Sequence, residues 1–326
     1  FVIGMAYVQK GKFTYTQETL EAEWRILHAT RNHLATKYRV GRNRVYAAGF
    51  SKGGWMSGFM LQRDPQLAGA VILGAGHIHA TDPKPRRFSN RKPLFIGIGR
   101  KDGNYPFSLR ALVFYRPLGV RTTMDTWHDL GHQFPEQGSA ALAQWLTIEA
   151  DPKADHRSAA TKWADDRLEE IKGMAKPIEQ WVALRDAKEA PFARLLGDNW
   201  QTGLDKRIKA LEAKAPVSRE TEALTAHRAL LRKEMGQHTQ ELYEGLLDDY
   251  FKLHQTYLDT RQGQIALEDH RRVKRLLQHF EEQDKIARKE ETKKEEDFVP
   301  EQPAKDPFEP KCPRSDRGIP RNPLIT

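Results

Sequence analysis

The chain has 326 residues, a formal net charge of +9 at pH 7, and 30% charged against 39% hydrophobic residues. The length accommodates two ordinary domains, and the charge content is typical of a soluble protein. No apolar run approaches the roughly 20 residues that a membrane-spanning helix needs, and the single cysteine, Cys312, excludes an internal disulfide and a cysteine zinc site.

The first predicted elements are a buried strand over 1–8, which is an apolar run, and a helix over 18–38 with its apolar residues largely on one face. The chain opens on this strand without an initiator methionine, so we expect a fragment or a processed chain that lacks the first strands of its sheet. The N-terminus does not have the layout of a signal peptide. The compartment therefore stays open: periplasm or secretion if a signal peptide precedes the chain, and cytoplasm otherwise.

The next predicted strand ends in a glycine-rich turn around Ser51. Residues 45–54 read VYAAGFSKGG, and apolar residues at helical spacing follow from Trp55 to Leu61. Flanking glycines remove the Cβ atoms that would clash in a sharp turn, and such a turn lifts the serine out at the end of the strand. The segment GFSKG therefore fits the GxSxG nucleophile elbow, with an ordinary serine in a surface turn as the alternative.

Two later predicted strands supply partners for Ser51. A serine hydroxyl is a weak nucleophile unless a base and an orienting carboxylate accompany it. The continuous apolar run 93–99 predicts a strand buried on both faces, and Asp102 follows its end. A further helix and a strand over 120–127 then lead to a loop that carries His132. We predict Ser51 as the nucleophile, His132 as the base and Asp102 as the orienting acid.

Other polar residues of this region offer competing roles. Asp125 and Asp129 compete with Asp102 for the role of the acid, which we assign to Asp102 because it follows the end of a strand directly. His128 and His132 are four residues apart, a metal-binding spacing on a helix, but glycine and proline in this segment predict a loop. The structural alternatives are a helix cap for Asp102 and an ordinary loop histidine for His132.

The predicted strand over 67–73 leads into a loop with His77 and His79. Because this loop follows the carboxyl end of a strand, it faces the crevice in which such sheets bind ligands. We predict that His77 and His79 bind substrate. Two histidines two residues apart could also supply half of the ligands of a metal ion. No carboxylate lies close to them in the sequence to complete such a site, so we predict no metal.

With nucleophile, acid and histidine in this order, each after a successive predicted strand, residues 1 to about 149 resemble the later part of an α/β-hydrolase. The similar branches are secreted esterases, polyhydroxyalkanoate depolymerases and dienelactone hydrolases. The resemblance implies a mostly parallel sheet flanked by helices and cofactor-free hydrolysis of a small-molecule or polymeric ester through an acyl-enzyme intermediate on Ser51. It also implies the backbone N–H of Lys52 as one oxyanion donor.

The family's second oxyanion donor follows an earlier strand, often at a His-Gly pair, and nothing before Ser51 matches it. Either preceding residues supply this donor, or the domain is a non-catalytic, hydrolase-like scaffold whose helical half binds partners. A serine peptidase with the same triad is a further alternative, because the acyl chemistry is shared.

The excess positive charge lies in the first 150 residues, which hold 20 Lys and Arg against 10 Asp and Glu, whereas the remainder holds 33 against 34. Two basic clusters, 39–44 and 84–92, lie in predicted loops without the interleaved aromatic residues of a nucleic-acid platform. We interpret them as a solvated surface and predict no nucleic-acid partner. Attraction of an acidic substrate or a polyanion is the alternative.

The second half of the chain has no β-prone runs and few glycines, and its apolar residues recur every three or four positions. We therefore predict an all-helical domain over 151–297 after the hydrolase-like domain 1–150, and a Pro-rich disordered tail over 298–326. Proline and glycine divide the helical domain into helices near 155–175, 177–195, 199–213, 218–261 and 263–293. We expect one of three roles for this helical domain: it covers the hydrolase-like domain, it associates with a second copy of the chain, or it docks a protein partner.

Overall fold

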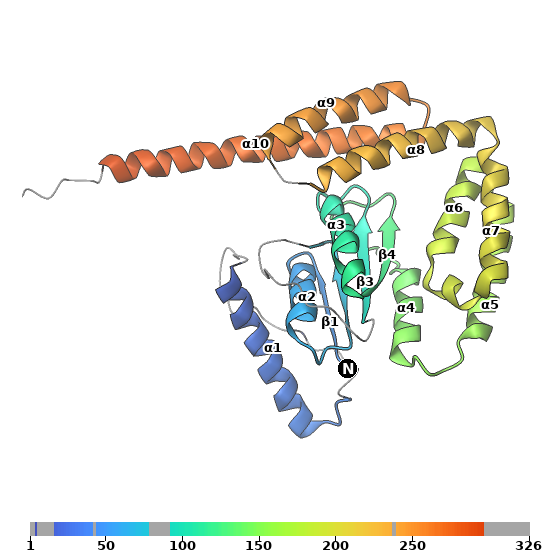
Figure 1. Ribbon diagram of the computed structural model, residues 1–326, viewed down its shortest axis with the longest axis horizontal. Coiled ribbons are helices and arrows are strands. Elements are labelled where there is room, and N and C mark those ends of the chain that lie inside the picture. Colours follow the sequence, from blue (N-terminus) through green and yellow to red (C-terminus); the bar gives the residue numbers. More distant parts are fainter. Residues whose placement is uncertain (1–3, 5–15, 42–43, 78–91, 237–238, 297–326) are drawn as a thin grey trace, which may run out of the picture. The chain divides into compact units, whose positions relative to one another are not determined.

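The computed structural model describes residue 4 and residues 16–41, 44–77, 92–236 and 239–296 (Figure 1). The predicted strand over 1–8, apart from Gly4, and the predicted tail over 298–326 lie outside the described residues. The chain divides into two compact units, residues 1–277 and 278–326. The first contains the sheet and most of the helices. Of the second, the structure describes the end of the last helix.

Four parallel strands form one sheet in the order of the sequence. They are β1 (Tyr46–Phe50), β2 (Gly69–Leu73), β3 (Pro93–Gly99) and β4 (Arg121–Trp127). Every residue of β3 is buried, as expected of a strand that is covered on both faces. All seven residues of β3 pair with β4, from Pro93 opposite Arg121 to Gly99 opposite Trp127.

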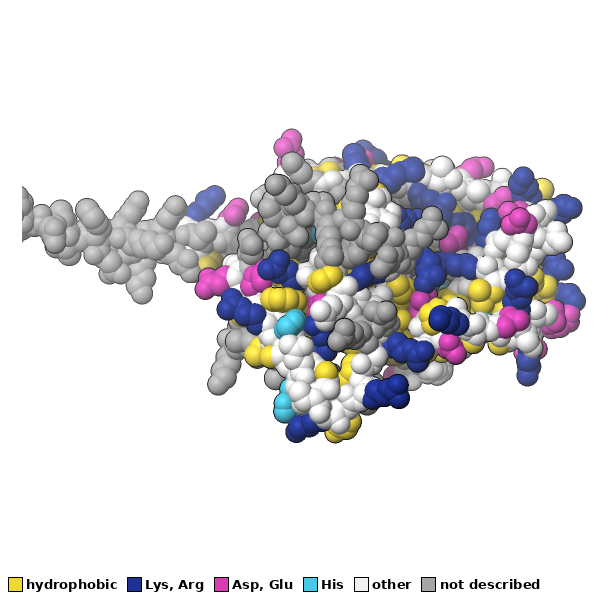
Figure 2. All heavy atoms as spheres, turned by 60° about the horizontal axis from the view of Figure 1, so that its bottom comes forward, with side chains coloured by type: hydrophobic (Ala, Val, Ile, Leu, Met, Phe, Trp, Pro, Cys, Tyr) yellow, Lys and Arg dark blue, Asp and Glu magenta, His cyan; other side chains and the backbone are white. Residues whose placement is uncertain are grey.

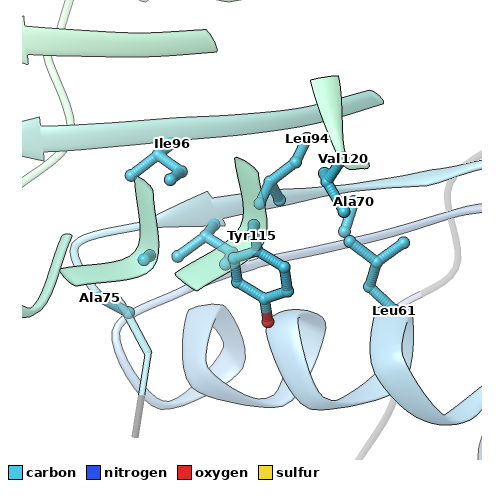
Figure 3. Packing of buried hydrophobic residues seen from close by; sticks show 9 residues of the cluster. Leu61, Ala70, Ala75, Leu94, Ile96, Tyr115 and Val120 are labelled. Atoms are coloured by element: carbon cyan, nitrogen blue, oxygen red, sulfur yellow. The ribbon is translucent and has the colours of Figure 1, made fainter. Parts of the chain in front are cut away.

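Helices cover both faces of this sheet. They are α1 (Gln17–Lys37), α2 (Lys52–Arg63), α3 (Tyr105–Tyr115) with the 3-10 turn η1 (Arg116–Leu118), and α4 (Ala140–Ala150). Alternate side chains of β3 point to opposite faces. Ile96 lies in the core cluster with Leu61 of α2 and Tyr115 of α3 (Figure 3), whereas Phe95 packs against Trp145 of α4. The predicted α/β class, a parallel sheet flanked by helices, is confirmed.

The described residues after α4 are largely helical, as predicted for 151–297. Its elements are α5 (Arg157–Gly173), α6 (Pro177–Glu189), the 3-10 helix η2 (Pro191–Leu195), α7 (Gly197–Glu212), α8 (Ala215–Glu234), α9 (Gln240–Thr256) and α10 (Arg261–Glu296). Helices α6 and α7 share a core around Trp181, Leu184 and Leu204. No helix among the described residues combines the length and apolarity needed to cross a bilayer.

One predicted helix, over 218–261, is wrong in its extent. The structure ends α8 at Glu234 and begins α9 at Gln240. The N–H of Gly236 bonds the carbonyl of Lys233, and the side chain of Thr239 accepts a hydrogen bond from the N–H of Leu242 as an N-cap. Gly236 thus marks the end of α8 and Thr239 the start of α9. The prediction missed this break because the apolar face of the segment continues across it in the sequence.

A buried network of charges joins the sheet to α8 and α10. Arg100, at the end of β3, forms a 2.7 Å ion pair with Asp269. Asp269 also pairs with Arg272 at 3.2 Å, and Arg272 pairs with Glu234. Two arginines and two carboxylates balance in charge. Burial acts to raise the pKa of Asp269, but Arg100 and Arg272 hold that pKa well below its usual range.

Further polar contacts tie the two halves together along α3 and β4. Arg110 of α3 donates to the backbone carbonyls of Met235 and Gly236, at the end of α8. Arg194 of η2 donates to the carbonyl of Thr122 in β4 at 3.2 Å. The helices therefore cover part of the sheet domain, which is one of the three roles expected from the sequence.

The depressed pKa of Asp269 predicts a pH dependence of stability. The contribution of Asp269 is expected to be complete above the pKa of an unfolded aspartate, about 3.9. It should shrink as the pH falls further, because unfolding then takes up a proton. In urea titrations, the free energies of unfolding of the wild type and Asp269→Asn should differ by a constant amount above about pH 5, and the difference should narrow below about pH 4.

The matched control is Asp259→Asn, which removes the exposed carboxylate that pairs with Arg219. An exposed pair contributes about 0–1 kcal/mol. At pH 7, Asp269→Asn should lower the free energy of unfolding by more than Asp259→Asn does. An equal or smaller loss would contradict the stabilising role of the buried pair.

Candidate active site

Ser51 stands on a strained turn between β1 and α2. Its φ of 54° and ψ of −117° make it the single non-glycine residue with positive φ in the described part of the chain. The turn requires the neighbouring glycines: a Cβ on Gly49 would lie 2.3 Å from the backbone of Gly53, and a Cβ on Gly54 would lie 2.7 Å from the carbonyl of Leu73. A strained residue held by its surroundings is typical of functional sites.

The Ser51 turn is fixed to the neighbouring strand. The N–H of Ser51 donates to the carbonyl of Leu73, at the end of β2, over 2.7 Å. Within α2, the carbonyl of Ser51 accepts from the N–H of Gly54 and of Trp55. The backbone of the serine is thereby held from both sides, which leaves its hydroxyl as the group that projects from the turn.

Asp102 lies in the turn after β3 and is 2% exposed. One carboxylate oxygen, Oδ1, accepts from the N–H of Asn104 at 2.8 Å. The side-chain amide of Asn104 donates to the carbonyl of Gly74, after β2. Asn104 thus joins the turn of Asp102 to the neighbouring strand end, and leaves the second oxygen, Oδ2, for another partner.

The loop after β4 crosses directly over the end of β3. The N–H of Lys101 donates to the carbonyl of Leu130 at 2.9 Å. Gly99 makes this approach possible, because a Cβ at this position would lie 2.2 Å from the carbonyl oxygen of Gly131. The loops that carry Asp102 and His132 are therefore packed and hydrogen-bonded against each other.

His132 connects the three side chains. Its Nδ1 lies 2.8 Å from Oδ2 of Asp102, and its Nε2 lies 2.8 Å from Oγ of Ser51. A carboxylate only accepts, so Nδ1 carries the proton and Nε2 is left to accept the serine hydroxyl. The His132 side chain is 44% exposed, and its ring lies 5.0 Å from that of Phe50. The site thus combines a buried acid with a base that solvent and substrate can reach.

The competing polar residues have other partners. Asp125 accepts from Nε1 of Trp127 at 2.7 Å and from Oγ of Ser139 at 2.6 Å, next to the start of α4. His128 lies 3.1 Å from Asp186 of α6, so His128 and His132 bond different carboxylates. Among the described residues, no group of three or more His, Cys, Asp or Glu side chains is arranged to hold a metal ion.

The remaining predicted site residues are His77, His79 and Lys52. The His77 ring stacks on Phe114 at 3.5 Å between ring centroids. The backbone N–H of His77 donates to the carbonyl of Phe107, in the first turn of α3. These contacts give His77 a packing role along α3, and a substrate contact stays a prediction. His79 lies outside the described residues. Lys52 is the first residue of α2.

Three of the four parallel strands, β1, β3 and β4, thus bring a serine on a sharp elbow, an aspartate and a histidine to one edge of the sheet, in that chain order. This part of the chain has an α/β-hydrolase fold. The parallel sheet, the sharp turn at Ser51 and the chain order of the three residues agree with the resemblance predicted from the sequence, over this part of the chain.

Several solved structures are similar to this part of the chain. The Bacillus cereus carboxylesterase is 21% identical, with a TM-score of 0.37, over 44% of this chain and 67% of that one. SOBER1 of Arabidopsis thaliana is 16% identical, with a TM-score of 0.35, over 41% and 66%. YahD with malic acid is 19% identical, with a TM-score of 0.36, over 40% and 64%. The match thus spans about two thirds of these proteins. No protein-family model and no curated protein matches the chain.

Sequence reasoning missed the residues that hold the site together. Asn104 follows Asp102 by two residues, a spacing at which the aspartate side chain can accept from the backbone. Gly99 ends a buried strand, where a glycine indicates a close backbone approach. Both signals are present in the sequence, but neither identifies the partner segment.

The close approach of the His132 loop to Gly99 predicts that adding one methyl group at Gly99 disturbs the site. Gly99→Ala should push the loop at Gly131 away, lower the free energy of unfolding by about 1–3 kcal/mol and lengthen the contact from His132 to Ser51. Gly103→Ala is the control, because nothing lies within 4 Å of a Cβ there. Urea unfolding and the NMR signals of the His132 imidazole measure both effects. Equal stability and unchanged His132 signals in both variants would contradict the steric account.

Proposed function

We propose that the chain is a serine hydrolase that cleaves carboxylic ester bonds through an acyl-enzyme intermediate. The observation that carries this proposal is the contact of His132 with both Ser51 and Asp102, at 2.8 Å each. A serine hydroxyl becomes an effective nucleophile when an adjacent base takes its proton, and the base works when a third group orients it. All three parts of this arrangement are in contact.

In the first half-reaction, Oγ of Ser51 attacks the ester carbonyl carbon while Nε2 of His132 takes the hydroxyl proton. The carbonyl oxygen becomes negatively charged in the tetrahedral intermediate. Collapse of this intermediate breaks the bond to the alcohol oxygen, which receives the proton from His132 as it leaves. Ser51 then carries the acyl group.

In the second half-reaction, water repeats these steps on the acyl-enzyme. Nε2 of His132 takes a proton from the water molecule, whose oxygen attacks the acyl carbon, and the proton passes to Oγ of Ser51 as the acid is released. Asp102 keeps the imidazole in the tautomer with the proton on Nδ1 and stabilises its charged form in both halves.

The proposed oxyanion donor is the backbone N–H of Lys52. Lys52 opens α2 directly after the nucleophile, so its N–H belongs to the first turn of a helix, at the positive end of the helix dipole. A donor of this kind stabilises the charge that develops on the carbonyl oxygen, and its loss typically reduces the rate by on the order of 10²–10³.

The proposal predicts hydrolysis of p-nitrophenyl acetate and p-nitrophenyl butyrate by the wild-type chain. Ser51→Ala should lower kcat on the order of 10⁶-fold, since removing a triad nucleophile removes most of the catalysis. Asp102→Asn should lower kcat about 10⁴-fold. Release of p-nitrophenolate measures each rate. The control is Ser158→Ala, which changes an exposed serine near the start of α5 and should leave kcat unchanged.

Two outcomes favour the alternatives over ester hydrolysis. Equal background rates in the wild type and Ser51→Ala, with folding verified by circular dichroism, would contradict the proposal and favour a non-catalytic scaffold. Cleavage of chromogenic peptides that depends on Ser51, without turnover of either ester, would favour a peptidase.

A further inference from the structure

The two residues before Asp102 hold its turn in place. Arg100 is the first residue after β3, and its N–H donates to the carbonyl of Trp127 at 2.9 Å. Lys101 in turn donates its N–H to Leu130. The backbone path into Asp102 is therefore set by Arg100 on one side and by the His132 loop on the other.

The side chain of Arg100 also contacts the residues that follow Asp102. Its guanidinium lies over the ring of Tyr105, 4.3 Å from the ring centroid, an arrangement that attracts a cation to an aromatic face. The N–H of Tyr105 donates to the backbone carbonyl of Asp102 at 3.1 Å. The guanidinium thus links the start and the end of the turn that carries the acid.

The far side of the guanidinium is held by the helical half of the chain. Its two terminal nitrogens donate to both oxygens of Asp269, at 3.3 and 2.7 Å, and Nε2 of His227 holds the same carboxylate by donating to Oδ2 of Asp269 over 2.7 Å. Such forked pairs fix an arginine in orientation as well as in position. Arg100, Asp269 and His227 are all buried.

Asp269 is itself fixed by further buried groups. Nε of Arg272 bonds one of its oxygens at 3.2 Å, and Arg272 is held by Glu234 of α8. Glu234 also accepts from the hydroxyl of Tyr250 of α9 at 2.8 Å. The anchor of Arg100 is therefore a rigid junction of α8, α9 and α10, far from the triad in the sequence.

We propose that Arg100 is a positioning residue of the triad, and that Asp269 and His227 of the helical half hold Asp102 in line with His132 through it. This inference rests on the proposed function. It makes the helical half a part of the active site: the sheet domain supplies the reacting groups, and the helices fix the acid.

The proposal has a kinetic consequence. A carboxylate that shifts by about 1 Å no longer orients the imidazole, and a misplacement of this size can cost about 10²-fold in rate. The shift affects the proton-transferring group and not the substrate contacts. We therefore expect kcat to fall and KM to stay within about twofold of the wild-type value.

The test uses the full chain with the double substitution Arg100→Met/Asp269→Leu. It removes one positive and one negative charge together and leaves Arg272 paired with Glu234, so that no buried charge is left without a partner. The matched control, Arg219→Met/Asp259→Leu, removes an exposed pair of the helical half. The double variant should lose about 100-fold in kcat and the control should keep its kcat.

A second variant, Arg100→Lys, retains the buried positive charge, so it keeps the test decisive even if the double variant does not fold. Lysine offers neither the forked geometry nor the flat surface that contacts Tyr105. Its kcat should lie more than threefold below the wild-type value and above the value of the double variant. A kcat within threefold of wild type in either folded variant would overturn the proposal.

A spectroscopic measurement separates this inference from the proposed function. We expect the proton between Nδ1 of His132 and Asp102 to give a downfield NMR signal in the wild type and in the control, and this signal to be lost or shifted in the double variant. If the wild type shows no turnover that depends on Ser51, the proposed function fails, and this signal alone decides the positioning role. An unchanged signal in the folded double variant would overturn it.

Discussion

The site depends on the pairing of β3 with β4. The two strands run parallel over seven residue pairs and end together at Gly99 and Trp127. Asp102 follows three residues after the end of β3 and His132 five residues after the end of β4, so a short turn and a short loop suffice to bring them into contact at 2.8 Å. The third member follows β1, where Gly49 and Gly54 allow close backbone approaches that any Cβ would prevent, and the chain can therefore turn sharply at Ser51.

The helical half supplies negative charge, which is scarce in the sheet domain. The first 150 residues carry twice as many Lys and Arg as Asp and Glu side chains, and Asp269 of the second half binds one of these cations, Arg100. On the face drawn in Figure 2, Lys and Arg side chains are scattered among Asp and Glu and do not form one continuous patch. Residues 42–43 and 84–91 of the two predicted basic clusters lie outside the described residues, so their interpretation as a solvated surface stays a prediction.

The parts of the fold that follow from local patterns were predictable. The run 93–99 predicted β3 without error because a strand buried on both faces is apolar throughout. The glycines around Ser51 predicted a sharp turn because only their missing Cβ atoms allow it. Asp102 was chosen over Asp125 as the acid because it directly follows a strand. In the structure, the carboxylate of Asp125 accepts hydrogen bonds from Trp127 and Ser139 instead.

The parts that depend on long-range contacts were not predictable. The partner of Arg100 lies 169 residues later in the sequence, and no pattern near either residue indicates the other. The ring of His77 stacks on Phe114, 37 residues later in the sequence, and no pattern near either residue indicates this contact. The break between α8 and α9 depends on two capping residues within a segment whose apolar face continues across it.

The central claim is that Ser51 is a nucleophile activated by His132, and covalent labelling tests it most directly. The folded chain is treated with a fluorophosphonate probe, and the modified peptide is identified by mass spectrometry, in the wild type and in His132→Ala. The account predicts a single adduct on Ser51 whose formation is strongly slowed in His132→Ala. Absence of any adduct on the folded wild-type chain, or an adduct on a different serine, would contradict it.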